Sequence, residues 1–272
     1  MGTISKALDL LEYFRSDRSE IGLSEFVRLS GRDKATVHRH LTELEGKGFL
    51  EQHPVSRAYR LGPAVLRLSA LREASFPVRR LLTPIVADLS EAVGELAHAS
   101  LLQGNALSPV AHADPCLHGV QVHFDPAEML PLHATASGLA ALAFGPEEWR
   151  ERMLARPLGR FTGKTVADAA GLRDRIDTTR RFGLSMSAGT FDEEVTSLGA
   201  PLFADGARLA GALAVAVPSA RARPERLEEI AGRLLRSAAR ASTSLGGTVA
   251  RAPQSPPAAF ADWMRRELEY VT

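Results

Sequence analysis

The 272-residue sequence lacks several features that mark other classes of protein. It has a single cysteine, Cys116, so no disulfide can form within the chain, and a reducing compartment is compatible with this composition. No run of about 18 apolar residues occurs, so no membrane-spanning helix is expected. The N-terminus enters a helical pattern at once, without a signal peptide, and the chain contains no internal repeat. We therefore expect a cytoplasmic protein with no membrane partner.

The chain also lacks an excess of either charge. Its 33 Lys and Arg residues face 32 Asp and Glu residues, which leaves a net charge of +1. Attraction of the whole molecule to nucleic acid is not implied, so any DNA binding must come from a local cluster of basic residues. Hydrophobic residues make up 45% and charged residues 24%, which is typical of a globular protein, and the length suggests about two domains.

What is present is most informative between residues 33 and 47, where the spacing predicts an amphipathic helix. The apolar stripe of this helix consists of Val37, Leu41 and Leu44. The hydrogen-bond donors of its first turns, mostly away from that stripe, are Lys34, Thr36, His38 and Arg39. A helix that is buried along one edge and carries donors near its start fits the major groove of DNA. An ordinary surface helix is the alternative.

The flanking residues favour the DNA-binding interpretation. Residues 23–29 form a short apolar-periodic run for which Ser24 is a candidate N-cap. Gly31 then provides a tight turn, because glycine tolerates positive φ. Helix, turn and helix together predict a helix-turn-helix.

Two strand-like segments follow that motif. Residues 48–51 and 58–61 read as a hairpin, with Arg57 at its tip. The hairpin is a wing, so we predict a winged helix-turn-helix. The basic residues clustered in this region are Arg28, Arg32, Lys34, Arg39, Lys47, Arg57 and Arg60. A first helix that packs on the motif is predicted from Ile4, Ala7, Leu8, Leu11 and Phe14.

Pro63 begins a strongly apolar helix that ends near Ser75. Its apolar residues are Val65, Leu66, Leu68 and Leu71. Such a helix between two units either pairs with a copy of itself or packs on its own chain.

The second unit is predicted to be a mixed sheet with helices on its faces, a shape suited to holding a small molecule. The predicted helices cover 77–94, 136–144, 147–155, 168–181 and 224–242. The predicted strands cover 95–102, 110–113, 120–124, 184–188, 198–203 and 209–217. Asp205 and Gly206 form a hairpin turn between the last two strands.

The C-terminal tail has two parts. Residues 246–257 are rich in Gly, Pro and Ala and predict a flexible linker. Residues 258–270 then predict a helix with an apolar stripe of Phe260, Trp263, Met264 and Leu268. We expect this helix to dock on the protein; a loose tail is the alternative.

The ordered set of motifs resembles the isocitrate-lyase-regulator (IclR) family of bacterial transcription factors. The segments that carry the resemblance are SKALDLLE at 5–12, GLSE at 22–25, KATVHR at 34–39, LEGKGF at 44–49, YRLG at 59–62, LPLHATASG at 130–138 and GAPL at 199–202. The resemblance covers residues 3 to about 242. It implies an α+β protein that binds palindromic operators in double-stranded DNA as a homodimer or a dimer of dimers.

The resemblance also implies a domain order. We assign residues 1–62 to a winged helix-turn-helix domain, 63–76 to a linker helix and 77–245 to a GAF-like mixed α/β effector-binding domain. Residues 246–272 form the linker and C-terminal amphipathic helix, which have no counterpart in the common pattern. The function implied is that of a ligand-responsive transcriptional regulator, either a repressor or an activator, that responds to a small metabolite.

The predicted DNA contacts fall into two groups. Phosphate contacts are assigned to Arg28, Lys47, Arg57 and Arg60, which would set position but not sequence. Base-edge contacts are assigned to Lys34, Thr36, His38 and Arg39, with a phosphate contact as the alternative for each.

The predicted effector-binding residues are Leu130, Ala136, Ser137, Ser187, Ser197, Ala214 and Ala216. Several depart from the family pattern. Ser187 or Ala188 stands where an acidic residue is common, Ser197 replaces a usual cysteine, and Ala214 and Ala216 replace two serines. The predicted wall is thus less polar than in family members that bind small carboxylates. The expected effector is an organic or aromatic acid, or a more apolar metabolite.

Two other classes of function are alternatives. The first is a metal-responsive regulator, because five histidines lie in the second unit: His98, His112, His118, His123 and His133. No carboxylate or second cysteine joins them at a recognised spacing, so we expect no metal or cofactor.

The second alternative is an enzyme with a DNA-binding module. Cys116 is two residues before His118, so the two are a candidate nucleophile and base. The sequence marks no third residue that would orient the pair. Residues 183–189 do not match the Gly-x-Ser-x-Gly motif of a nucleophile elbow, because Ser187 stands after Met186 where the motif requires glycine. We therefore expect no catalytic activity.

Overall fold

The structure is a computed structural model that describes residues 2–247 and 256–271. Its contacts divide the chain into two compact units, Met1–Pro77 and Val78–Thr272, which are described separately below. None of the helices within the described ranges has the length and apolarity needed to cross a membrane.

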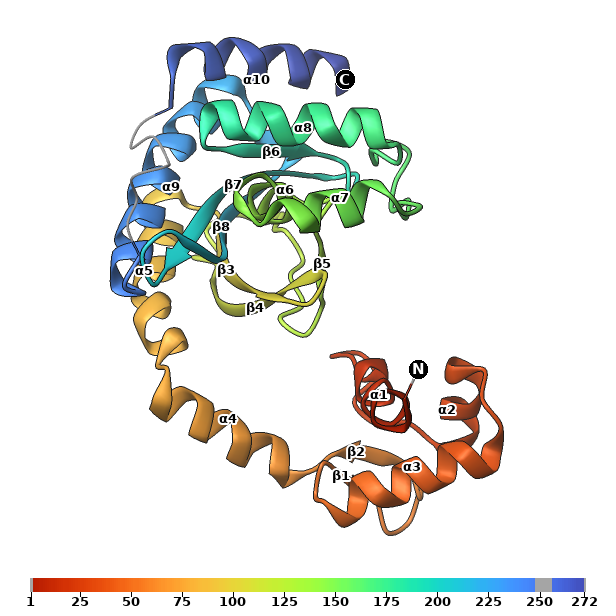
Figure 1. Cartoon of the computed structure of the whole chain (residues 1–272). Helices are drawn as coiled ribbons and strands as arrows, with labels where there is room; N and C mark the ends of the chain where they lie inside the picture. Colours follow the sequence, from red (N-terminus) through yellow and green to blue (C-terminus); the bar gives the residue numbers. More distant parts are fainter. Residues whose placement is uncertain (1, 248–255, 272) are drawn as a thin grey trace. The chain divides into compact units, whose positions relative to one another are not determined.

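The first unit is a winged helix-turn-helix (Figure 1). Its elements are α1 (Thr3–Leu8), the 3₁₀ turn η1 (Leu11–Tyr13), α2 (Leu23–Ser30), α3 (Lys34–Gly46), β1 (Leu50–Gln52), β2 (Tyr59–Leu61) and α4 (Pro63–Ser75). β1 and β2 pair antiparallel as the wing. Gly31 ends α2 with a φ of 62°, as the tight turn predicts.

The core of this unit gathers apolar residues from every one of those elements except α1 and α4. Its buried members are Leu10, Phe14, Ile21, Phe26, Val37, Leu41, Leu44, Leu50 and Tyr59. Three rings pack edge-on around Phe26, from Tyr13, Phe14 and Tyr59. The stripe Val37, Leu41 and Leu44 is therefore the buried edge of α3.

Two predictions for this unit were wrong. Ser24 is not an N-cap, because α2 already begins at Leu23 and its cap is Gly22, which has no side chain to accept a hydrogen bond. The first helix is broken after Leu8, and Ile4 and Leu8 are 78% and 47% exposed rather than packed. After the break, Leu10 and Phe14 are buried in the core and Leu11 packs against it, so the prediction is correct for Leu11 and Phe14.

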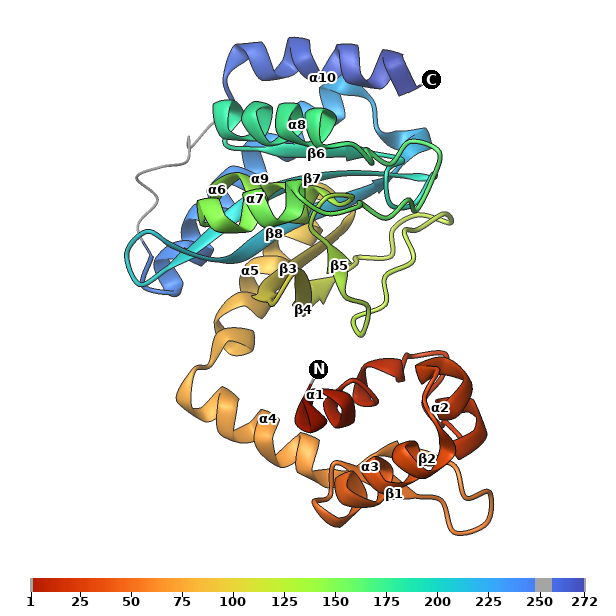
Figure 2. The ribbon, with the colours of Figure 1, turned by 45° about the vertical axis from the view of Figure 1, so that its right-hand side comes forward.

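The second unit is built on one six-stranded sheet with the order β5-β4-β3-β8-β7-β6. All five strand pairs are antiparallel, so the prediction of a mixed sheet was wrong. The strands are β3 (Leu96–Gln103), β4 (Ala106–Ala113), β5 (Leu130–Pro131), β6 (Ser185–Ala188), β7 (Val195–Ala204) and β8 (Arg208–Pro218). One face is covered by α5 (Val78–Val93) and α9 (Pro224–Ser244); the other carries α6 (Ala136–Phe144), α7 (Glu147–Leu154) and α8 (Ala169–Phe182) (Figure 2). A short 3₁₀ turn, η2 (Ser219–Arg221), joins β8 to α9.

Alternation along the central strand β8 separates two cores. Leu213, Val215 and Val217 belong to the cluster formed with α5 and α9. Ala212, on the opposite side, belongs to the cluster formed with α6 and α8. The small residues at the alternate positions of β8, Ala214 and Ala216, leave room on that second face, where they line a cavity.

One predicted strand is absent. Residues 120–124 alternate apolar and polar side chains, but they lie in the irregular segment between β4 and β5 and have no strand partner. Alternation predicts a strand only where a neighbouring strand supplies the backbone hydrogen bonds.

The tail helix α10 (Ala258–Val271) docks on the second unit, as its apolar stripe predicts. Phe260 and Met264 are fully buried in the same core as α5 and α9. The Phe260 ring lies 5.5 Å from that of Phe182, and Arg175 of α8 pairs with Glu267 at 2.5 Å. Most of the predicted flexible linker, residues 248–255, lies outside the described residues.

Candidate DNA-binding face and ligand cavity

The exposed face of α3 carries the predicted base-reading residues. Asp33 caps the helix by accepting a hydrogen bond of 2.9 Å from the Thr36 backbone N–H, and this bond lowers the pKa of the Asp33 carboxyl. Lys34, His38 and Arg39 are exposed. Thr36 is half-buried beside the cap. The start of α3 thus presents two cations and an imidazole to solvent.

The basic residues around α3 differ in how they are held. Arg32 belongs to the framework, because its guanidinium lies 2.7 Å from Asp9 Oδ2 and 2.5 Å from the Lys6 carbonyl oxygen. Arg28 pairs with Glu25 at 3.2 Å, and Arg60 pairs with Glu51 across the wing at 2.6 Å. These two pairs offset part of the positive charge predicted for phosphate contacts.

Two predicted phosphate contacts, Lys47 and Arg57, are exposed and have no ion pair among the described residues. Lys47 is the C-cap of α3, next to the wing. Arg57 lies in the wing turn with a φ of 59°, and its carbonyl oxygen accepts a hydrogen bond of 2.7 Å from the Gln52 side chain. The side chain of Arg57 is therefore carried at the tip of the hairpin.

A cavity of the second unit lies on the α6 face of the sheet and has a volume of about 140 Å³. We call it the sheet cavity. Its floor is a row of paired residues: Leu96 of β3 faces Ala216 of β8, which faces Ser197 of β7, which faces Ser187 of β6. All seven predicted effector-binding residues line this one cavity. Their role in binding a ligand stays a prediction.

The start of α6 forms one side of the sheet cavity, where Ala136 and Ser137 are buried. The Thr135 side chain caps this helix by accepting a hydrogen bond from the Gly138 N–H at 3.0 Å. From the sheet, the Ser185 hydroxyl donates to the Ala136 carbonyl oxygen at 2.6 Å. Gly199 permits this approach, since a Cβ there would lie 2.5 Å from the same oxygen. The helix start is thus fixed against β6 and β7.

Sequence reasoning missed several lining residues. His98 of β3 is fully enclosed beside Ala214, and burial lowers the pKa of its imidazole to about 4. Its ring lies 4.9 Å from that of Phe124. The remaining lining residues that were not predicted are Leu96, Val122, His123, Asp125, Glu128, Thr135, Phe191, Asp192 and Val195. His98 could have been found from the pairing of strands 95–102 and 209–217, but the loop residues left no local signal.

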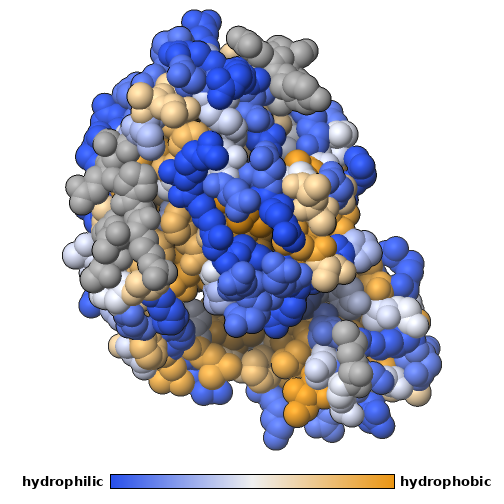
Figure 3. Space-filling model, turned by 45° about the horizontal axis from the view of Figure 1, so that its top comes forward, coloured by the Kyte–Doolittle hydropathy of each residue, from blue (hydrophilic) through white to orange (hydrophobic). Residues whose placement is uncertain are grey.

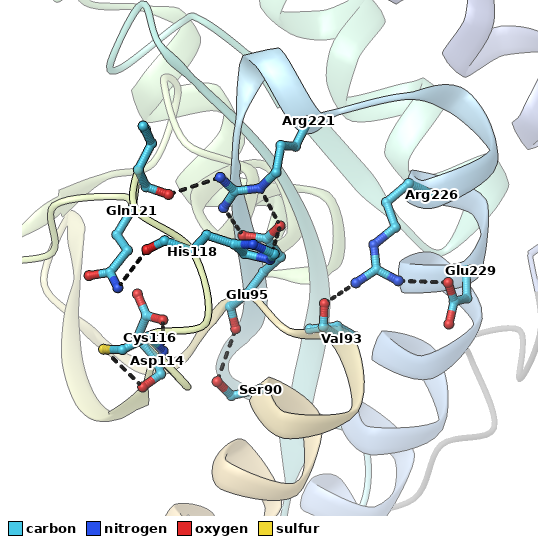
Figure 4. A network of polar contacts seen from close by, with 11 residues as sticks. Ser90, Val93, Glu95, Asp114, Cys116, His118, Gln121, Arg221, Arg226 and Glu229 are labelled. Atoms are coloured by element: carbon cyan, nitrogen blue, oxygen red, sulfur yellow. Dashed lines mark hydrogen bonds and ion pairs between the residues drawn. The ribbon is translucent and has the colours of Figure 1, made fainter.

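An ion-pair network holds the start of the β4–β5 segment, which continues into the cavity wall (Figure 4). The buried Glu95 accepts two hydrogen bonds from Arg221, at 2.9 and 2.7 Å, and the pairing raises the pKa of the arginine. Arg221 also donates to the Val120 carbonyl oxygen at 2.9 Å. His118 Nε2 lies 4.0 Å from Glu95. η2 and the β4–β5 segment are therefore tied to the start of β3.

The histidines and the cysteine do not form a reactive cluster in the described part of the chain. No group of three His, Cys, Asp or Glu residues is placed there to hold a metal ion. Cys116 is exposed in a turn with a φ of 53°. His133 Nε2 contacts the Gly159 carbonyl oxygen at 2.8 Å, which ties the residues before α6 to a distant loop.

Comparisons with known proteins point to one family for both units. Residues 3–54 match the model of the IclR helix-turn-helix domain, and residues 73–243 match that of the bacterial transcriptional regulator IclR C-terminal domain. The glycerol operon regulatory protein of Streptomyces griseus is 31% identical over 224 residues, which span 82% of this chain and 87% of that protein.

Solved structures agree with these matches. An IclR-type transcriptional regulator from Silicibacter sp. superposes with a TM-score of 0.84 at 44% identity, covering 94% of this chain and 100% of that one. An IclR homologue from Microbacterium hydrocarbonoxydans, solved with 4-hydroxybenzoate, gives a TM-score of 0.73 at 25% identity, covering 90% and 99%.

Proposed function

The chain belongs to the IclR family of bacterial transcriptional regulators, and from that premise we propose how its two units act. It is a DNA-binding regulator with an effector-binding C-terminal domain, and it is not an enzyme. The proposal concerns three finer points: how the first unit meets DNA, how copies of the chain pair, and what the sheet cavity does.

The first unit places the start of α3 in the major groove of a palindromic operator. Lys34, Thr36, His38 and Arg39 face the base edges, since they lie in the first turns of α3, mostly away from its buried stripe, with Arg39 on the opposite side. Arg28, Lys47, Arg57 and Arg60 contact phosphates; the ion pairs of Arg28 and Arg60 make Lys47 and Arg57 the stronger candidates. Two copies then meet successive major grooves about 34 Å apart, or a multiple of it.

The linker helix α4 joins two copies. Leu66, Leu68 and Leu71 are 76%, 41% and 57% exposed, and apolar side chains gather along this helix (Figure 3). An apolar surface of this kind is typical of a protein–protein contact. A homodimer, or a dimer of dimers, covers it and sets the spacing of the two α3 helices.

The sheet cavity binds a small organic effector with an apolar body. The observation that carries this point is the convergence of seven predicted residues, from five separate elements, on one cavity of about 140 Å³. A cavity of roughly this size holds one aromatic ring. The Microbacterium relative was solved with 4-hydroxybenzoate, a single-ring compound.

Effector binding changes DNA binding only if the dimer has two arrangements that bind the effector with different affinities. The cavity wall includes the start of α6 and segments fixed by the Glu95–Arg221 pair. A ligand that favours one arrangement of these segments shifts the spacing of the DNA-binding units.

As a bacterial gene regulator, the protein would act in the cytoplasm.

The test of the DNA-binding proposal is a variant at Arg39. An operator would first be selected from random DNA with the wild-type protein. Arg39→Ala should cost roughly 1–3 kcal/mol on that operator and relax the preference at one base pair. Arg173→Ala, an exposed arginine of α8, removes the same charge from the second unit and should change neither quantity. Equal losses on operator and random DNA would make Arg39 a phosphate contact.

A further inference from the structure

A second cavity of the second unit, with a volume of about 340 Å³, has a residue of the tail helix α10 in its wall. We call it the tail cavity. α10 runs beside α8 in both ribbon views (Figure 1 and Figure 2), and Glu267 of α10 and Arg175 of α8 both line the cavity. The match to the family's C-terminal domain ends at residue 243, before α10 begins. The tail cavity is therefore completed by an element outside the matched family domain.

The guanidinium of Arg175 is held at the wall of the tail cavity by α10. Its Nη2 lies 2.5 Å from Glu267 Oε2, and the two side chains are 25% and 23% exposed. The guanidinium carbon also lies 6.0 Å from the centroid of the Trp263 ring, a distance that fits a cation–π contact. Arg175 is thus a positioned cation that already binds a carboxylate, and that carboxylate belongs to the chain itself.

Apolar side chains form much of the remaining wall: Leu139, Val166, Met186 and Ala188. The hydroxyl groups of the wall are already bonded within the chain, because Thr190 donates to the Ala134 carbonyl oxygen at 2.6 Å and bonds to Ser187. Lys164 adds a cation at the exposed rim but has a contact of its own. A ligand with an apolar body and one negative charge would therefore place that charge on Arg175.

The sheet cavity differs from the tail cavity in this respect. Neither lysine nor arginine occurs among the described residues that line the sheet cavity. A guanidinium binds a carboxylate through charge-assisted hydrogen bonds, which are stronger than bonds between neutral groups. Among the described lining residues of these two cavities, a guanidinium is present only in the tail cavity.

Glu267 competes with any such ligand for Arg175, but its hold is weak. Ion pairs between partly exposed side chains contribute little, because water screens them and two long side chains must be ordered. Phe260 and Met264 are buried in the core, so α10 stays docked when the Glu267 side chain turns into solvent. A ligand that also buries an apolar body in the cavity gains a contact that Glu267 does not make.

We propose that the tail cavity is a second small-molecule site, which binds an organic carboxylate on Arg175 in place of Glu267. The proposal goes beyond the proposed function, whose effector lies in the sheet cavity. Glu267 then acts as an internal competitor that the tail helix carries to the site.

The compounds 2-naphthoate and 2-naphthamide test this proposal, because they have nearly one shape and differ in charge. Their two fused rings exceed the single ring that fits the sheet cavity. Binding of each compound to the full chain would be measured by calorimetry at pH 7. The carboxylate should bind at least about tenfold more tightly than the amide, because hydrogen bonds to a charged group are the stronger ones. No binding of 2-naphthoate at millimolar concentration, or no preference over the amide, would overturn the proposal.

Three variants assign the preference to Arg175. Arg175→Gln should reduce the preference to below about threefold, because it removes the cation. Glu267→Gln should strengthen the binding of 2-naphthoate by about threefold or more, because it removes the competing carboxylate and keeps the side-chain size. Arg173→Gln removes the same charge from an exposed position of α8 and should bind both compounds like the wild type.

The opposite directions of the first two effects separate competition from a purely structural role. Arg175→Gln and Glu267→Gln break the same ion pair, so a change caused only by loosening of α10 would shift binding in the same direction in both. Weaker binding of 2-naphthoate to Glu267→Gln, or an undiminished preference in Arg175→Gln, contradicts the proposal.

Discussion

His98 is the residue whose chemistry the fold changes most. Its imidazole is enclosed between the sheet and Phe124, and its pKa falls from 6.5 to about 4 because burial disfavours the charged form. The unfolded chain therefore binds a proton at a pH where the folded chain does not. The contribution of His98 to stability is intact above about pH 6.5 and is lost as the pH falls towards 4.

This shift predicts a pH-dependent stability difference. The free energy of unfolding should fall between about pH 7 and pH 4.5, and His98→Gln should remove roughly 2–3 kcal/mol of that fall. Urea unfolding of both proteins at pH 7 and pH 4.5 measures the fall in each. His123→Gln, at an exposed position of the same unit, serves as the control and should keep the wild-type difference. Parallel pH profiles for wild type and His98→Gln would show that His98 does not titrate as described.

Single residues also show where sequence reasoning succeeds. The left-handed turn at Gly31 was predicted correctly, because it is set by the residue itself and its near neighbours. The cap at Asp33 was not predicted. Ser24 failed as a cap because glycine at 22 already starts the helix. Three acidic residues of the cavity wall were missed, since Asp125, Glu128 and Asp192 come together only when the β4–β5 segment and the β6–β7 turn are placed.

At the scale of the element, α10 stabilises the second unit. Phe260 and Met264 are fully buried, and burying each such side chain is worth about 1.5–3 kcal/mol before the cost of ordering the helix. Truncation after Gly247 should therefore lower the melting temperature. Phe260→Ala should also lower the melting temperature, because it should reduce the free energy of unfolding by roughly 3 kcal/mol or more. Arg265→Ala on the exposed side of α10 should have little effect.

Melting curves and the fluorescence of Trp263 report on this docking together. The indole is half-buried and lies 5.7 Å from the Phe182 ring, so its emission should be that of a partly shielded tryptophan. Equal melting of truncated and full-length protein, together with the emission of a fully solvated Trp263, would contradict the docked helix.

α4 is the element on which dimerisation is proposed to depend. Leu68 and Leu71 lie three residues apart on one side of the helix and are exposed in the single chain. Leu68→Glu/Leu71→Glu should shift the sedimenting species to a smaller size, because it buries charges in the contact. Ala169→Glu/Ala170→Glu adds the same charge to exposed positions of α8, outside the proposed contact, and should sediment like the wild type. Identical sedimentation of all three proteins would place the contact elsewhere.

The elements were predictable to different degrees for a physical reason. Helices such as α3, α5 and α9 follow from local periodicity, which holds along most of each helix. Residues 120–124 also alternate, but a strand needs a partner that local sequence does not supply. The docking surface for α10 likewise required the placement of Phe182, about 80 residues earlier in the chain.

At the scale of the whole molecule, the resemblance to a family contributed what local patterns could not. The seven cavity residues lie between positions 130 and 216 and share no local motif, yet four strands and α6 bring them to one cavity. The predicted departures at Ser187, Ser197, Ala214 and Ala216 rest on that resemblance. Other parts of the cavity wall come from loops, which vary most within a fold.

The central claim is that a ligand in the sheet cavity alters the binding of DNA by the other unit. It is tested by measuring operator affinity with and without a saturating ligand chosen from a thermal-shift screen of metabolites. Coupling between sites is typically 1–3 kcal/mol, so the dissociation constant for the operator should change by about fivefold or more. In Ala214→Phe, which fills the sheet cavity, the same ligand should leave operator affinity unchanged. Equal operator affinity in the wild type with and without bound ligand would contradict the claim.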